Sequence, residues 1–355
     1  QVHSQKGSAP SMALIMLDLL LFVLAVAKGE VPAIIVFGDS TVDAGNNNVI
    51  STFVKSNFQP YGRDFDGGRP TGRFSNGRIS SDFISEAFGL KPFVPAYLDP
   101  QYRIEDFATG VSFASAGTGY DNVTSNVLNV IPLWKEMEFF VDYQSKLREA
   151  FGHETASKII REALYIISAG TNDFLENYYA IPTRRSQFSI EQFQDFLVEI
   201  ASRFITQLYN FGARKISFTG LPPMGCLPME RTINIFYHRD CVQSYNDVAL
   251  QFNDKLDTLV SQLNRNLPGM KIIYTRDVYN TLLSAIIDPA SYGFEVSALA
   301  CCASGTFEMG YLCNWQSATC PDASKYVFWD AFHPTEKTSK LLADQVINLL
   351  TEVFR

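Results

Sequence analysis

The stretch Ala33-Ile34-Ile35-Val36-Phe37 runs directly into Gly38-Asp39-Ser40-Thr41. Consecutive apolar residues that end at a glycine are typical of a strand buried on both faces of a parallel sheet. Gly38 allows a tight turn, so Ser40 would open the loop or helix after the strand. A serine in this place is usually only a helix N-cap. Functional side chains nevertheless collect at the carboxyl ends of such strands, which makes Ser40 a candidate.

Four similar apolar runs follow along the chain, at residues 111–114, 163–168, 215–219 and 271–274. The longer stretches between them carry apolar residues three and four positions apart, as in residues 188–211, and this spacing is typical of helices. Alternating strands and helices favour right-handed crossovers and a parallel sheet covered on both faces. Because no linker, repeat or low-complexity segment interrupts the pattern, we predict one α/β domain over residues 28–355.

The N-terminal region has the pattern of a leader. Residues 12–27 are apolar except for Asp18 and end in Ala25-Val26-Ala27, which is the small-x-small pattern of a signal-peptidase site. The apolar stretch is too short to cross a bilayer comfortably. We predict that residues 1–27 are a signal peptide, of which residues 1–11 are an upstream extension. The alternative is a buried or amphipathic N-terminal helix.

The composition is that of a globular protein, with 46% hydrophobic and 19% charged residues in a chain of 355. The 29 Lys and Arg residues stand against 37 Asp and Glu residues, so the formal net charge is −8. No window holds a dense run of basic residues. We therefore expect neither a nucleic-acid partner nor docking to an anionic membrane.

All six cysteines lie between residues 226 and 320, and an even number suits export to an oxidising compartment. A zinc site would require paired C-x-x-C motifs or several histidines nearby, whereas this segment has no such motif and a single histidine, His238. We predict three disulfides and no metal. The expected pairing joins Cys226 to Cys241 and joins the adjacent Cys301 and Cys302 each to one of Cys313 and Cys320, in an order left open.

A serine hydrolase needs a base, and the chain has only four histidines. His3 lies in the leader, which leaves His153, His238 and His333. His333 stands in Asp330-Ala331-Phe332-His333-Pro334, where one loop could carry both a general base and the carboxylate that orients it. The alternative is that His333 only precedes a helix over residues 335–353, with Pro334 in its first turn.

Two further strand ends offer hydrogen-bond donors for a developing negative charge. Gly117, in Ser115-Ala116-Gly117-Thr118-Gly119, presents an unobstructed backbone N–H, and Asn172, in Gly170-Thr171-Asn172-Asp173, presents a side-chain amide. Such segments are usually plain turns and caps. Their position at the ends of predicted strands, together with Ser40 and His333, favours an acyl-transfer site. The chain has no G-x-S-x-G motif, which excludes the common α/β-hydrolase elbow.

Taken together, these motifs resemble the GDSL esterase/lipase family of SGNH hydrolases, in particular its secreted plant branch. The resemblance covers essentially the whole mature chain. The matching segments are residues 37–47, 67–77, 110–117, 170–173, 221–226 and 330–333. Two residues depart from the family pattern, because Thr41 replaces the Leu of the family name and Ser112 replaces an Asn common in relatives. Every catalytic position is retained.

The resemblance implies a three-layer α/β/α, flavodoxin-like fold around a five-stranded parallel sheet. It also implies a secreted esterase that acts without a cofactor on small-molecule or polymeric acyl esters in the apoplast or cell wall. Ser40 would be the nucleophile, His333 the base and Asp330 the orienting acid. The oxyanion hole would be formed by the N–H groups of Ser40 and Gly117 and by Asn172.

Other functions share these residues. An acyltransferase would use the same acyl-enzyme, and a wall- or lipid-binding protein could carry a silent site. The candidate ester substrates are lipids, wax- or cutin-type polyesters and acetylated wall polysaccharides.

The sequon Asn122-Val123-Thr124 is the only one in the chain, and in an exported protein it predicts a glycan at Asn122 on a surface loop. We expect the peptide that contains Asn122, from protein made in a secreting plant host, to lose mass on treatment with a glycosidase. Mass spectrometry of this peptide with and without the enzyme checks the prediction. An unshifted peptide contradicts it.

Overall fold

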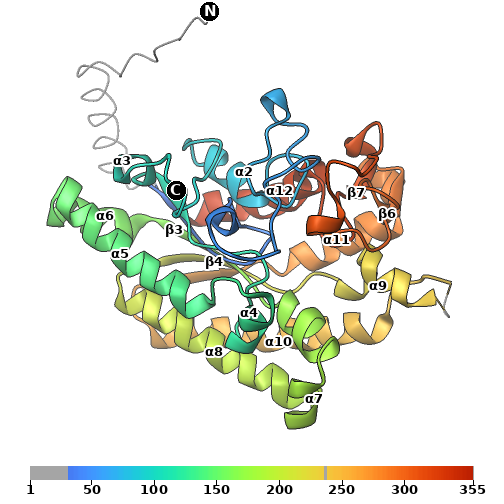
Figure 1. The fold of residues 1–355 in the computed structure, drawn as a ribbon. Helices are drawn as coiled ribbons and strands as arrows, with labels where there is room; N and C mark the ends of the chain where they lie inside the picture. The colour runs from blue at the N-terminus through green and yellow to red at the C-terminus, as the bar shows by residue number, and fades with distance from the viewer. Residues whose placement is uncertain (1–30, 236–237, 355) are drawn as a thin grey trace, which may run out of the picture.

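The computed structural model describes residues 31–235 and 238–354 (Figure 1). It is built around a five-stranded sheet. The strand order is β2-β1-β3-β4-β5, and all neighbouring pairs are parallel. Each predicted apolar run forms one strand, with ends within two residues of those expected. The strands are β1 (Ile34–Gly38), β2 (Gly110–Ser112), β3 (Leu164–Ser168), β4 (Lys215–Thr219) and β5 (Lys271–Tyr274).

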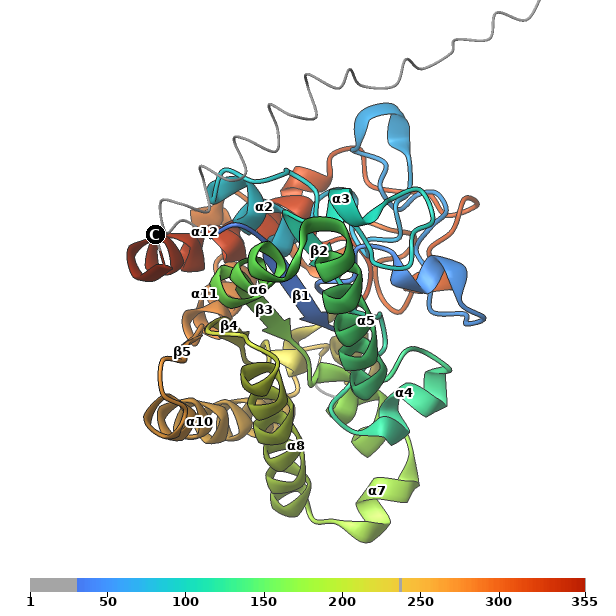
Figure 2. The same cartoon turned by 90° about the vertical axis from the view of Figure 1, so that its left-hand side faces the viewer.

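Helices pack on both faces of this sheet and make three layers (Figure 2). In β1, Ile34 and Val36 point to one face and Ile35 and Phe37 to the other, and all four side chains are fully buried. This explains why the strand is apolar throughout rather than alternating. The first face is covered by α2 (Ser80–Ala87) and α12 (Glu336–Phe354), and the second by α5 (Leu133–Phe151), α8 (Ile190–Asn210) and α10 (Gln243–Asn266).

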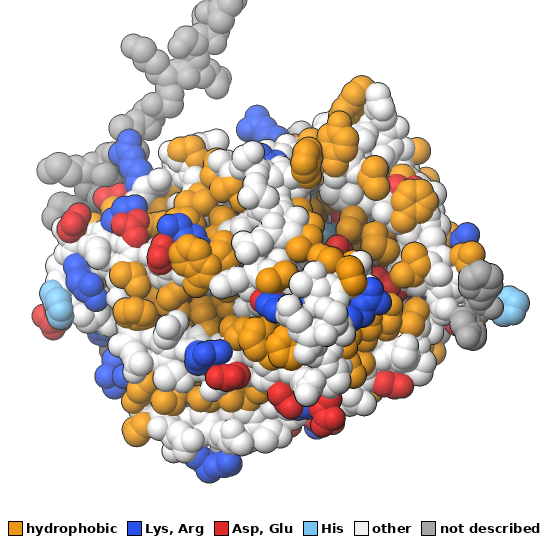
Figure 3. Space-filling model, turned by 60° about the horizontal axis from the view of Figure 1, so that its bottom comes forward, with side chains coloured by type: hydrophobic (Ala, Val, Ile, Leu, Met, Phe, Trp, Pro, Cys, Tyr) orange, Lys and Arg blue, Asp and Glu red, His pale blue; other side chains and the backbone are white. Residues whose placement is uncertain are grey.

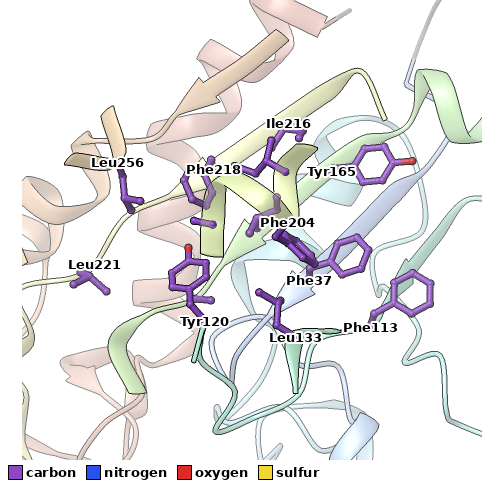
Figure 4. Close-up of a cluster of buried hydrophobic side chains, with 14 of the residues drawn as sticks. Phe37, Phe113, Tyr120, Leu133, Tyr165, Phe204, Ile216, Phe218, Leu221 and Leu256 are labelled. Atoms are coloured by element: carbon purple, nitrogen blue, oxygen red, sulfur yellow. The ribbon is translucent and has the colours of Figure 1, made fainter. Parts of the chain in front are cut away.

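Aromatic rings fill the larger part of the core, on the second face (Figure 4). The ring of Phe37 lies 5.3 Å from that of Phe113 and 5.4 Å from that of Phe204, measured between centroids. Phe204 comes from α8, the helix predicted over residues 188–211. A capping box starts α8 after Phe188, because Ser189 and Gln192 exchange side-chain-to-backbone hydrogen bonds.

The other helices connect the strands or cover their ends. The helix expected over residues 335–353 is α12, and a π-helical segment over Asp173–Tyr179 follows β3. Among the described residues, no helix is both long and apolar enough to cross a bilayer. The predicted signal peptide, residues 1–27, lies outside the described residues. The remaining helices are α3 (Ile104–Phe107), α4 (Asn122–Leu128), α6 (His153–Glu162), α7 (Pro182–Gln187), α9 (Pro228–Ile233) and α11 (Asp277–Ile287).

A second, two-stranded parallel sheet of β6 (Val296–Ala300) and β7 (Tyr326–Phe328) was not predicted. The two cysteines after β6 extend the contact, since the amides of Cys301 and Cys302 donate to the carbonyls of Phe328 and Trp329. The structure resolves the pairing that the sequence left open. The three disulfides are Cys226–Cys241, Cys301–Cys320 and Cys302–Cys313.

Asn122 lies in a helix rather than in the expected surface loop. It is the first residue of α4, because the Asp121 carboxylate accepts the amide of Val123 at 3.1 Å and caps the helix there. The Asn122 side chain is exposed, whereas Thr124 is buried and its hydroxyl donates to Asp173 at 2.6 Å. Glycosylation of Asn122 stays a prediction.

Arg73 and Asp82 form a buried ion pair that joins the loop before α2 to the helix itself. Two parallel contacts of 2.8 Å link the guanidinium and the carboxylate, and the side chains are 5% and 0% exposed. Asp82 also accepts the amides of Ile79 and Val94, so its oxygens are fully used. The pair anchors the segment that continues into Phe74, which packs against His333 at 4.7 Å between ring centroids.

We expect Arg73→Met to lower the free energy of unfolding by about 3–5 kcal/mol, because Asp82 would stay buried without its cation. Urea denaturation followed by circular dichroism measures the change. The control is Arg203→Met, since Arg203 and its partner Glu199 are both exposed and the pair should contribute at most about 1 kcal/mol. A loss for Arg73→Met no larger than that of the control contradicts the prediction.

Candidate active site

Ser40 lies just beyond β1, where the chain turns tightly against β3. The amide of Asp39 donates to the carbonyl of Ser168 at 3.0 Å. Gly38 has a φ of +135°, and a Cβ atom there would lie 1.8 Å from the Ser168 oxygen, so only glycine fits this turn. Ser40 itself is 5% exposed. The close approach of β1 to β3 therefore fixes where the candidate nucleophile leaves the sheet.

Asp330 and His333 lie together on a tight turn after β7. The Asp330 carboxylate accepts the backbone amides of Phe332 at 2.9 Å and of His333 at 2.7 Å. Each of its oxygens also lies 2.8 Å from Nδ1 of the His333 imidazole. Asp330 is fully buried and His333 is almost fully buried. The Asp330 carboxylate thus fixes both the backbone turn and the orientation of the His333 imidazole.

Tyr61 is a further contact of Asp330 that the sequence did not indicate. Its phenol donates to the carboxylate at 2.6 Å and accepts the amide of Gly310 at 2.7 Å. Tyr61 is fully buried, and burial first, with the nearby Asp330 second, raises its pKa well above the usual value. The phenol therefore stays protonated and remains a donor. No local pattern signals a contact between residues 269 positions apart.

The two candidate oxyanion donors beyond Ser40 are set by close packing. Gly117 has a φ of +87°, and a Cβ atom there would lie 2.9 Å from a methyl group of Leu128. The amide of Asn172 donates one hydrogen to the carbonyl of Thr118 at 2.9 Å, which leaves its second hydrogen for another acceptor. Asn172 is therefore tied to the glycine loop that it faces.

At the first departure from the family pattern, the Thr41 hydroxyl donates to the carboxylate of Asp39, two residues earlier, at 2.7 Å.

At the second departure, Ser112 keeps a link between the first two motif segments. Its hydroxyl donates to the carbonyl of Val42 at 3.1 Å. The backbone carbonyl of Ser112 accepts the side chain of Asn46 at 2.8 Å, and the same amide also reaches the carbonyl of Ala114 at 2.8 Å. The loop after β1 is thus fastened to β2 without an asparagine at position 112.

Buried carboxylates brace the loops on which these donors sit. Asp43 accepts the amide of Ala116, next to Gly117, at 3.0 Å, and burial raises its pKa to about 6. Asp173, next to Asn172, accepts the amide of Tyr120 at 2.7 Å, and burial raises its pKa to about 7. The sequence placed both acids inside the motifs but gave no sign of these long-range contacts.

A third buried acid, Glu136 on α5, supports the turn before Ser40. Its carboxyl group accepts the amide of Gly38 at 2.9 Å. Glu136 is fully buried, and burial raises its pKa well above the usual value, which favours the neutral form. The backbone on both sides of the candidate nucleophile is therefore held by buried acids, since Asp39 accepts the amide of Thr41 at 3.0 Å.

Ser40, Gly117, Asn172 and His333 line one pocket, although they come from four distant parts of the chain. Most of the remaining wall is apolar and includes Phe53, Val54, Phe74, Leu128, Met309 and Phe332. The other candidate bases, His153 and His238, are exposed and do not line this pocket. Among the described residues, no group of three or more His, Cys, Asp or Glu side chains is arranged to hold a metal ion.

Comparison with known proteins finds relatives along almost the whole chain. A family model described as GDSL-like lipase/acylhydrolase matches residues 34–346. The GDSL esterase/lipase At2g42990 of Arabidopsis thaliana is 59% identical over 347 residues, which are 98% of this chain and 98% of the relative. The GDSL esterase/lipase At2g04570 of the same plant is 56% identical over 93% of this chain and 95% of its own length. Because these matches span almost the whole length of both proteins, the chain belongs to the GDSL-like lipase/acylhydrolase family.

Proposed function

We propose that the protein hydrolyses carboxylic acyl esters, with Ser40 as the nucleophile. The observation that carries the proposal is the pocket shared by Ser40, His333, Gly117 and Asn172, together with the Asp330 carboxylate behind the imidazole. Membership of a family described as lipase/acylhydrolase supports the same reaction class.

The reaction proceeds in two halves. Asp330 occupies Nδ1 of His333, which leaves Nε2 free to take the Ser40 proton as Oγ bonds to the ester carbonyl carbon. Asp330 stabilises the imidazolium that forms. His333 then returns the proton to the leaving alcohol oxygen as the carbon–oxygen bond breaks, which produces an acyl-enzyme and a free alcohol. Water attacks the acyl-enzyme by the same path and releases the acid and Ser40.

Negative charge develops on the carbonyl oxygen in both halves. The N–H groups of Ser40 and Gly117 and the free amide hydrogen of Asn172 would receive it. Their supports are rigid, since Asp43 and Asp173 hold the loops that carry Gly117 and Asn172. Donors fixed before the reaction stabilise the charge without reorganisation, which is the largest contribution in many acyl-transfer enzymes.

We further propose that residues 1–27 direct export, that residues 28–355 form one domain and that the mature protein acts outside the cell. Support comes from the small-x-small end of the apolar leader and from the cysteines. Every cysteine in the described part of the chain is in a disulfide, which suits an oxidising compartment.

We expect Ser40→Ala and His333→Ala each to lower kcat for p-nitrophenyl acetate by ~10⁴-fold or more, because either change removes the activated nucleophile. Initial rates on the purified variants measure the loss. His153→Ala serves as the control, since His153 is exposed at the start of α6 and should keep the parental rate. Near-full activity of Ser40→Ala would defeat the assignment.

We expect Tyr61→Phe to lower kcat for p-nitrophenyl acetate by about tenfold, because the carboxylate that orients the His333 imidazole would lose its 2.6 Å hydrogen bond from the phenol. Initial rates on the purified variant measure the loss, and urea denaturation measures the accompanying change in stability.

The control is Tyr143→Phe, which removes another buried phenol, one that donates to the carbonyl of Phe107 at 3.0 Å. It should lower stability but leave kcat unchanged. If Tyr61→Phe lowers stability as this control does and also leaves kcat unchanged, then Tyr61 is only a packing residue.

A further inference from the structure

Large hydrophobic side chains surround the mouth of the active-site pocket and point into solvent. Phe53, Tyr311 and Leu312, which we call the apolar rim, are 90%, 69% and 56% exposed. All three line the pocket that holds Ser40 and His333. Phe53 has the most exposed of the large hydrophobic side chains in the described part of the chain. Figure 3 draws a face of the molecule on which hydrophobic side chains gather around a hollow.

The rim stands on two loops that are far apart in the sequence and adjacent in space. In Figures 1 and 2, the segment after β1 lies beside the segment that leads to β7. Two contacts join them, because the amide of Gly310 donates to Tyr61 and the ring of Phe58 packs at 6.4 Å from that of Tyr311. The rim is therefore one surface made of two loops.

Both loops hold the rim in place by fixed contacts. On either side of Phe53, the Thr52 hydroxyl donates to the carbonyl of Leu128, and the carbonyl of Val54 accepts the side chain of Asn47, both at 2.8 Å. Tyr311 and Leu312 lie inside the loop closed by the Cys302–Cys313 disulfide. These side chains are thus held in solvent on a braced backbone, and within residues 31–235 and 238–354 no other segment covers them.

The charges around the pocket indicate what kind of surface can bind to the rim. Among the described residues that line the pocket there is no Lys or Arg, and the only carboxylate is Glu176, whose pKa is raised by burial. The whole chain carries a formal charge of −8. The protein would therefore repel an anionic surface. An uncharged apolar surface could contact the rim without burying an unpaired charge.

We propose that the apolar rim docks the protein onto the surface of a neutral lipid phase, so that acyl esters pass from that phase into the pocket. The proposal rests on the ester hydrolysis proposed above, because it makes the phase the source of the substrate. The rim is continuous with the pocket that holds Ser40, so an ester at the interface reaches the nucleophile without first dissolving in water.

Binding to triolein emulsion droplets, measured by flotation, tests the docking without any catalysis. In a Ser40→Ala background, we expect Phe53→Ser/Leu312→Ser to weaken droplet binding by about tenfold, because two large apolar contacts are lost. The matched control is Trp134→Ser/Ile287→Ser, which removes two hydrophobic side chains that are 51% and 71% exposed and do not line the pocket. Equal binding by the rim variant and its parent overturns the proposal, as does an equal loss in the control.

Two further measurements test whether the rim acts in hydrolysis and whether the lipid surface is neutral. In the active protein, the ratio of the rate on emulsified triolein to the rate on dissolved p-nitrophenyl acetate should fall about tenfold for the rim variant and stay constant for the control. Adding phosphatidylglycerol to the droplets should not strengthen binding, and a gain would overturn the neutral-surface assignment. If no ester is hydrolysed but droplets still bind through the rim, the proposed reaction fails while the docking stands.

Discussion

The candidate site depends on one close approach, that of the end of β1 to the end of β3. No side chain fits at Gly38, because the Ser168 carbonyl occupies the place of its Cβ atom. Ser40 consequently lies just beyond the carboxyl end of β1, and the polar residues after it contact the neighbouring loops. Asn46 bonds to carbonyls in and just after β2, and Asp43 bonds to the loop of Gly117. A bulkier residue at position 38 would disturb all of these contacts together.

Buried acids are unusually numerous around this edge. Asp43, Asp173 and Glu136 are fully buried, and each accepts at least one backbone amide that would otherwise lack a partner. Burying a carboxyl group disfavours its charged form, which is why burial is the largest cause of the raised pKa in each case. Burial costs these acids their solvation, but their hydrogen bonds fix the shape of the loops. Those loops carry the groups that would face the oxyanion.

The sequence predicted the parts of the fold that local patterns encode. Apolar runs located the five strands of the main sheet, and three-and-four spacing located α8. Motif spacing also named Ser40, Gly117, Asn172 and His333, which line one pocket. The β6–β7 sheet was missed because its strands are short and most residues of β6 are only half-buried or exposed. Tyr61 was missed because a hydrogen bond across 269 residues leaves no trace in nearby residues.

The disulfides lie close to the turn that carries Asp330. The amide of Cys302 donates to Trp329, the residue just before that aspartate, and Cys301 donates to Phe328. Both cysteines are crosslinked to the loop that follows them, through Cys313 and Cys320. Recombinant chains made in a bacterial cytosol would lack these crosslinks, and the strand beside Asp330 would be held by hydrogen bonds alone. Production in the periplasm or in a eukaryotic secretory host therefore matches the architecture of this protein.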